Sequence, residues 1–333
     1  MEPILKVKDV SVDFETKRGV LRAVDNISLD IYKGEILGVI GESGSGKSTL
    51  ASAILNLVTS PGKISSGKIA YIGNDNSEVN LNDLESDELN KYRWTNLATV
   101  FQAAQNALNP VLKIKDHAIE TVLAHDPKKS EEEIINKAKE VFKYVRLDEK
   151  VLDAYPHQLS GGMKQRTIIA LSLLLDPEII ILDEPTTALD VITQWYIIDI
   201  LRKIHEDLGV TMIFLTHDVS IIASVVDRIV VMYAGQIVEY GDVKDVFGKP
   251  SHPYTYGIIN AIPSLFDEVS DRRAIPGGPP SLIGIGNHCR FADRCMFKES
   301  GKCRGENKDS NTLNIVKEGQ ASRCNKWKEV MAL

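Results

Sequence analysis

Short apolar segments alternate with helical patterns along most of the chain. Residues 1–35 read as β-strands, and at Ile27, Leu29 and Ile31 apolar side chains alternate with polar ones, which predicts a half-buried strand. Four runs are mostly apolar, as in strands buried on both faces: 35–40, 179–182, 212–216 and 228–233. Helical spacing covers about 116–175 and 194–208. The alternation predicts an α/β fold with a mostly parallel sheet covered by helices.

The pattern changes after residue 240. Proline and glycine cluster at 276–286, and all four cysteines follow them. A chain of 333 residues has room for about two domains. We therefore expect a main domain at 1–240, with a helical subdomain at about 103–175, and a C-terminal extension at 241–333. The cysteines mark a small module at 285–333 within that extension.

Charge and hydropathy exclude some functions. The net charge is −7, which argues against a basic surface for nucleic acid. The N-terminus lacks the apolar core of a signal peptide. The longest mostly apolar run, 168–175, is too short to cross a bilayer. A function at a membrane would require a partner that spans it.

Residues 41–48 read GESGSGKS and match the phosphate-binding pattern G-x-x-x-x-G-K-[S/T]. The loop follows a predicted strand and precedes a predicted helix, which is the context this motif requires. Glycines let backbone N–H groups surround the phosphates, while Lys47 reaches the β- and γ-phosphates and Ser48 offers its hydroxyl to Mg²⁺. The nucleotide-binding residues that we expect here are Gly41, Ser43, Gly44, Ser45, Gly46, Lys47, Ser48 and Thr49.

The apolar strand at 179–182 ends in two carboxylates. Asp183 at the strand tip suits direct or outer-sphere binding of Mg²⁺. Glu184 is placed to orient and polarise an attacking water. Together with the phosphate loop, the pair predicts nucleotide hydrolysis.

Between these motifs, residues 159–163 read LSGGM. Ser160, Gly161 and Gly162 precede a predicted helix, and a small N-cap with bare amides makes a second anion-binding helix terminus. The segment resembles the LSGGQ signature of ATP-binding cassette (ABC) ATPases, with Met163 in place of the last glutamine. Phosphate loop, signature and Asp-Glu strand follow one another in the order of that family, and the resemblance covers essentially the whole chain.

The resemblance implies a fold and further site residues. The expected fold is a P-loop ABC ATPase core, with a mixed sheet containing RecA-like parallel strands, antiparallel β and helical subdomains, and a C-terminal extension. Gln102 matches the glutamine of the Q-loop, which the resemblance implies is a Mg²⁺ ligand, and Asp190 matches the aspartate of the D-loop. His217 matches the switch histidine. Phe14 matches the aromatic residue that stacks on adenine. In the family each ATP lies between the phosphate loop of one subunit and the signature of another.

Several stretches are similar to ABC importers of the oligopeptide/dipeptide type: 101–110, 155–158, 252–255, 261–263, 275–282 and 289–295, with departures at 103–104 and 287–288. That resemblance implies an ATPase subunit on the cytoplasmic face of the cell membrane. Its implied partners are a second ATPase subunit, with a heterodimer favoured, two transmembrane permeases and an extracytoplasmic solute-binding protein. The alternative cargo is an oligosaccharide or nickel. A non-transport ABC ATPase is disfavoured because only about 110 residues separate phosphate loop and signature.

The cysteines are Cys289, Cys295, Cys303 and Cys324. Their C-x5-C-x7-C-x20-C spacing lacks the close pairs of typical structural zinc sites. Four thiolates hold either Zn²⁺ or an iron–sulfur cluster, and the resemblance implies a 4Fe-4S cluster, with Zn²⁺ as the alternative. Free or disulfide-linked cysteines are a third possibility, disulfides being disfavoured in a reducing cytosol. The neighbouring Arg290, Arg294 and Arg304 are candidates to offset the negative charge of a cluster.

Overall fold

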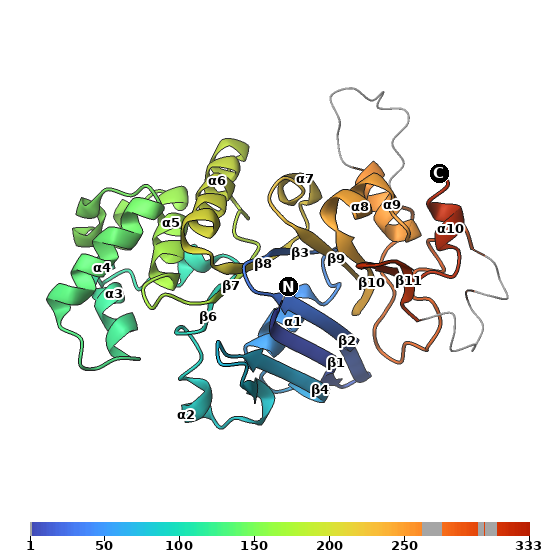
Figure 1. Cartoon of the computed structure of the whole chain (residues 1–333), viewed down its shortest axis with the longest axis horizontal. Helices are drawn as coiled ribbons and strands as arrows, with labels where there is room; N and C mark the ends of the chain where they lie inside the picture. Colours follow the sequence, from blue (N-terminus) through green and yellow to red (C-terminus); the bar gives the residue numbers. More distant parts are fainter. Residues whose placement is uncertain (1, 262–274, 299–302, 304–311) are drawn as a thin grey trace. The chain divides into compact units, whose positions relative to one another are not determined.

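The computed structural model describes residues 2–261, 275–298, 303 and 312–333 (Figure 1). The chain divides into two compact units. The first comprises residues 32–36 and 83–215, and the second residues 2–31, 37–82 and 216–333. Pro263 and Arg304, which the sequence analysis names, lie outside the described residues.

Three parallel strands form the sheet of the first unit. β6 (Leu97–Val100) pairs with β7 (Ile179–Asp183), which pairs with β8 (Thr211–Thr216). Every residue of β7 and β8 is buried. Strands covered on both faces need continuous apolar runs, which is why the sequence shows runs here and not alternation.

Helices make up most of the rest of the first unit: α2 (Ser86–Leu89), α3 (Ile114–Leu123), α4 (Glu131–Tyr144), α5 (Gly161–Ser172) and α6 (Val191–Leu208). The capping box expected at Ser130 and Glu133 is present at the start of α4. Helix α6 begins three residues before the predicted Gln194, because Asp190 caps it. It ends at Gly209, whose φ of 66° is the left-handed conformation that glycine adopts readily.

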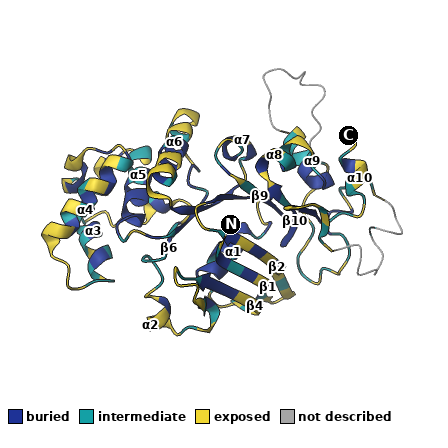
Figure 2. Ribbon diagram, viewed as in Figure 1, coloured by how far each residue is buried: buried dark blue, intermediate teal, exposed yellow. Residues whose placement is uncertain are grey.

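The second unit contains an antiparallel sheet built from the N-terminal third of the chain. Its strands are β1 (Pro3–Thr16), β2 (Gly19–Tyr32), β4 (Gly62–Ile72) and β5 (Glu78–Asn80), in the order β2-β1-β4-β5. β1 has four consecutive buried residues at 10–13, whereas buried and exposed residues alternate at 27–31 of β2 (Figure 2). The alternation in β2 confirms the half-buried strand that the sequence predicts.

The other strands of the second unit are β3 (Ile36–Ile40), β9 (Arg228–Tyr233), β10 (Gln236–Asp242), β11 (Asn314–Lys317) and β12 (Gln320–Ser322). They follow the order β11-β12-β10-β9-β3, with β3 parallel to β9 and the other pairs antiparallel. The short helices of this unit are α1 (Lys47–Ile54), α7 (Val219–Ile222), α8 (Val243–Gly248), α9 (Pro253–Asn260) and α10 (Trp327–Val330). The C-terminal extension thus adds strands to a sheet of the main domain, and β10 crosses the boundary expected at residue 240.

Within the described residues, no helix combines the length and the apolar character needed to span a membrane.

Candidate functional site

The phosphate loop connects β3 to α1 in the second unit, as the sequence predicts. Gly44 and Gly46 have φ angles of 77° and 100°, in the region that favours glycine. A Cβ atom on Gly46 would lie 2.4 Å from the carbonyl oxygen of Ala23. Backbone freedom and close packing therefore both require glycine at position 46.

Lys47 is 5% exposed and its side chain turns back onto the loop. Its Nζ donates to the carbonyl oxygens of Gly41 at 2.7 Å and Glu42 at 3.1 Å. Ser43, Gly44 and Ser48 are exposed, Thr49 is partly exposed, and Ser45 is buried. The exposed Ser48 hydroxyl at the start of α1 is a suitable hard oxygen donor for Mg²⁺.

Phe14 and His217 also belong to the second unit. Phe14 lies on β1 opposite Gly62 of β4, and its ring occupies the space that a Cβ on Gly62 would need. The ring is partly exposed. His217 is exposed and directly follows β8. Adenine stacking by Phe14 and a switch role for His217 stay predictions.

The two predicted carboxylates lie at the end of β7 in the first unit. Asp183 is buried, and its carboxylate is an oxygen donor of the kind that Mg²⁺ prefers. Glu184 has a φ of 50°, and its N–H donates to the carbonyl oxygen of Leu215 at 2.8 Å. Gln102 Nε2 donates to Glu184 Oε2 at 3.1 Å, and Thr187 Oγ1 donates to the same oxygen at 2.8 Å. The structure thus brings two predicted residues together and adds Thr187, which the sequence analysis missed.

The signature and the D-loop line one cavity of about 420 Å³ in the first unit. Ser160 caps α5 by accepting a hydrogen bond from Met163 N at 3.3 Å, as predicted from its small polar side chain. Asp190 caps α6 through Thr193 N at 3.0 Å, and hydrogen bonds from Thr193 lower the pKa of Asp190. A Cβ on Gly162 would lie 2.8 Å from Thr193 Cγ2, so the two segments are in close contact. The other side chains at this cavity include Arg166 and Tyr196, which stack with the Arg166 guanidinium 5.3 Å from the ring centre.

All four cysteines line a second cavity, of about 110 Å³, in the second unit. They are free thiols, and the N–H of Cys289 donates to the carbonyl oxygen of Cys303 at 3.2 Å. Burial raises the pKa of Cys289 to about 11 and that of Cys324 to about 12. Thiols in such surroundings become thiolates only when a bound cation compensates the charge.

The arginines between the cysteines are engaged elsewhere. Arg290 forms an ion pair with Asp25, and Arg294 with Glu42 of the phosphate loop. From the sequence we expect both arginines to offset the charge of a cluster, and their carboxylate partners are not predicted. The only sequence signal was the presence of oppositely charged residues, which does not identify partners 252 positions apart.

The described residues contain no group of three or more His, Cys, Asp or Glu side chains placed to hold a metal ion. A magnesium–nucleotide site is compatible with this finding, since Mg²⁺ is usually bound through one or two carboxylates and the substrate phosphates. For the cysteines, the same finding supports neither a zinc ion nor an iron–sulfur cluster.

Two family models match the chain. Residues 24–187 match the ABC transporter model, and residues 238–303 match the model of the oligopeptide/dipeptide transporter C-terminal region. Among curated proteins, the dipeptide transport ATP-binding protein DppD of Caldanaerobacter subterraneus subsp. tengcongensis is 45% identical over 298 residues, covering 89% of this chain and 90% of that protein. The oligopeptide transport ATP-binding protein OppD of Escherichia coli K12 is 38% identical, covering 88% and 86%.

Solved structures of ATP-binding cassettes are also similar to this chain. The dimeric ATP-binding cassette MJ0796, in a post-hydrolysis state bound to ADP and Pi, is 33% identical with a TM-score of 0.62, covering 72% of this chain and 98% of that one. The protein cbiO1 from Clostridium perfringens, described as part of the ABC transporter complex cbiONQ, is 31% identical with a TM-score of 0.63. The match covers 74% of this chain and 92% of that one. Fold and phosphate loop together define an ATP-binding cassette ATPase that binds ATP with Mg²⁺. The chain belongs to the ABC transporter family and, within it, to the proteins that carry the oligopeptide/dipeptide C-terminal region.

Proposed function

We propose that this chain is the ATP-hydrolysing subunit of an importer for dipeptides or oligopeptides. The observation that carries the proposal is the combination of a complete phosphate loop and signature with the oligopeptide/dipeptide C-terminal region in one chain. The relatives named as dipeptide and oligopeptide transport ATP-binding proteins match most of its length. No observation favours oligosaccharide or nickel import.

The second unit binds the nucleotide phosphates. Lys47 exchanges the carbonyl oxygens of Gly41 and Glu42 for the β- and γ-phosphates, and backbone N–H groups at the start of α1 contribute further donors. The residues that would hold Mg²⁺ are Ser48, Gln102 and Asp183, all through oxygen atoms. Bound Mg²⁺ would neutralise charge on the phosphates.

The first unit supplies the hydrolytic carboxylate. Glu184 accepts the proton of the attacking water and orients it, while Gln102 and Thr187 hold its Oε2. His217 contributes a further polar contact to the γ-phosphate. Phe14 stacks on adenine. These roles follow from the family resemblance and from the chemistry of the side chains.

The proposed complex contains more than one chain. The cavity shared by Ser160, Gly161, Gly162 and Asp190 receives the ATP held by a second ATPase subunit, in a heterodimer. Residues 102–110 contact two membrane-spanning permeases, and a solute-binding protein delivers the peptide. The chain accordingly acts at the cytoplasmic face of the membrane. Residues 1–240 form the ATPase domain and 241–333 the extension.

For the cysteines we favour a 4Fe-4S cluster over Zn²⁺. Four sulfurs around one cavity match the ligand set of such a cluster. Their spacing along the chain lacks the close cysteine pairs of typical structural zinc sites. The cluster would cross-link residues 289–324, and its role in this proposal is structural, because small modules with few apolar residues need such cross-links.

The test is reconstitution of the chain with its permeases, partner ATPase and solute-binding protein in liposomes. We expect ATP hydrolysis to rise when the solute-binding protein carries a peptide, and peptide to accumulate in the compartment that contains the ATPase, opposite the solute-binding protein. The same complex with Lys47→Ala is the control for ATP hydrolysis by contaminating ATPases. Stimulation by an oligosaccharide or Ni²⁺ in place of a peptide would contradict the proposal.

A further inference from the structure

Residues outside the phosphate-loop motif contact the phosphate loop and hold it in place. We call residues 289–295 the cysteine segment. Arg294 of this segment places Nη1 2.9 Å from Glu42 Oε2, and Glu42 is the second residue of the phosphate loop. The Arg294 side chain is only 7% exposed and the Glu42 side chain 31%. Arg294 Nε also donates to the carbonyl oxygen of Pro276 at 2.8 Å, which fixes the guanidinium.

The main chain of Glu42 is held from the same side. Its N–H donates to the hydroxyl oxygen of Tyr254 at 2.9 Å. The Tyr254 ring packs against Tyr233 and Phe291, with ring centres 4.6 Å and 5.4 Å away. Phe291 belongs to the cysteine segment, so side chain and backbone of Glu42 both depend on how this segment is placed.

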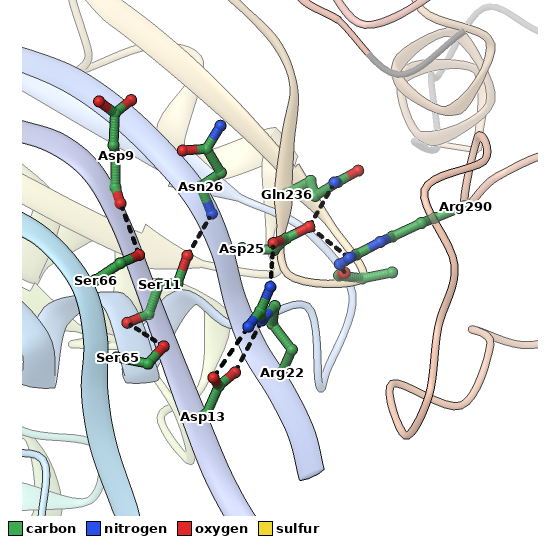
Figure 3. Close-up of polar contacts among 11 residues, drawn as sticks. Asp9, Ser11, Asp13, Arg22, Asp25, Asn26, Ser65, Ser66, Gln236 and Arg290 are labelled. Carbon is green, nitrogen blue, oxygen red and sulfur yellow. Dashed lines mark hydrogen bonds and ion pairs between the residues drawn. The ribbon is translucent and has the colours of Figure 1, made fainter. Parts of the chain in front are cut away.

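A second connection starts at Arg290 and is drawn in Figure 3. The Arg290 guanidinium donates to the Ala234 carbonyl oxygen and to Asp25 Oδ2, which also accepts from Gln236 Nε2 at 2.8 Å. The next residue in the turn, Gly235, donates its N–H to the carbonyl oxygen of Ser45 in the phosphate loop at 2.9 Å. The cysteine segment therefore reaches the loop at two points.

The negative charges of Glu42 and of ATP explain why the Arg294 contact would affect ATP binding. Glu42 is the only acidic residue among residues 41–48, where ATP brings several negative charges. A carboxylate next to a polyanion opposes binding, and the opposition is strong where protein lowers the effective dielectric constant. The Arg294 guanidinium compensates this carboxylate in a half-buried ion pair.

We propose that Arg294 is a positioning residue of the ATP site: by neutralising and holding Glu42, the cysteine segment sets the affinity of the phosphate loop for ATP. The proposal rests on ATP binding by this loop and adds a determinant outside the known motifs. It also makes folding of the cysteine segment and ATP binding favour each other, since thermodynamic coupling is reciprocal.

The experiment is a double-mutant cycle on the purified full-length chain, with Mg-ATP affinity measured by calorimetric titration. We expect Arg294→Gln to weaken affinity by roughly 5- to 10-fold. Glu42→Gln should bind at least as tightly as the wild type, and the double variant should bind like Glu42→Gln. Lys298→Gln is the matched control, because Lys298 forms an exposed ion pair with Asp293 close to the same segment.

Rescue by Glu42→Gln separates charge compensation from general damage to the fold. A double variant as weak as Arg294→Gln would overturn the proposal, as would wild-type affinity in Arg294→Gln. If Arg294→Gln does not fold, Arg294→Lys takes its place, since it keeps the charge and loses the bond to Pro276. Affinity of Arg294→Lys within about twofold of the wild type supports the proposal, and a larger loss overturns it. A wild-type chain that does not bind ATP would instead contradict the proposed function.

Discussion

The phosphate loop of the second unit differs in construction from Gln102, Glu184 and Thr187 of the first unit, which we propose for hydrolysis and call the hydrolytic corner. The loop is shaped by backbone, with glycines in conformations that other residues avoid and a lysine bonded to loop carbonyls. The corner is shaped by side chains, because Gln102 and Thr187 both donate to one oxygen of Glu184. The difference indicates that nucleotide binding and hydrolysis are separable by mutation. Three predictions test this separation, and a fourth tests what else supports the loop.

The largest effect is expected at the hydrolytic corner. Glu184→Gln keeps size and hydrogen bonding but removes the proton acceptor, so hydrolysis in the assembled complex should fall by roughly 10²- to 10⁴-fold. ATP affinity of the isolated chain should stay unchanged, as measured by titration. Glu206→Gln, on the exposed surface of α6, is the control. Hydrolysis near the wild-type rate would show that another group activates the water.

The converse change is made in the loop. Lys47→Ala removes a charged donor aimed at the phosphates, and losing a charge-assisted hydrogen bond of about 1.5–3 kcal/mol lowers ATP affinity by roughly 10- to 150-fold. Calorimetric titration measures the change, with the exposed Lys203→Ala as control. Unchanged affinity would remove Lys47 from the phosphate site.

A smaller effect tests the support of Glu184. Thr187→Val keeps the shape but removes the donor that lies 2.8 Å from Glu184 Oε2. A net hydrogen bond of about 1 kcal/mol corresponds to a roughly fivefold lower hydrolysis rate. ATP affinity should not change. A variant that loses affinity while keeping its rate would place Thr187 in binding, against the separation of the two regions.

The smallest effect concerns the connection between the cysteines and the loop. Cys324→Ser should remove iron and acid-labile sulfide from protein purified without oxygen, since one of four ligands is lost. Through Arg294, ATP affinity should then fall by about two- to threefold, less than in Arg294→Gln. Met296→Ala, at an exposed position in the same region, is the control. Wild-type protein that contains zinc and no sulfide would contradict the cluster and favour the alternative ion.

Some parts of the fold could be predicted residue by residue. The buried strands β7 and β8 are apolar runs, and α4 begins at the predicted capping box. The start of α6 could not, because Val191 and Ile192 are 67% and 83% exposed and do not follow the apolar periodicity of a helix face. The strands β11 and β12 have three or four residues each, which is too short to show a pattern.

The sequence by itself determined the phosphate loop, the caps of α4 and α5, and the carboxylates at the end of β7. Each depends on residues that are neighbours in the chain, so backbone geometry and local hydrogen bonds carry the information. Tertiary structure decided that Thr187 joins Gln102 at Glu184, that four cysteines spread over 289–324 line one cavity, and that Arg294 holds Glu42. These contacts join side chains whose meeting depends on the path of the whole chain. From the sequence, charge and thiol chemistry indicate which side chains are able to interact. Which of them are in contact is decided by the packing of the folded chain.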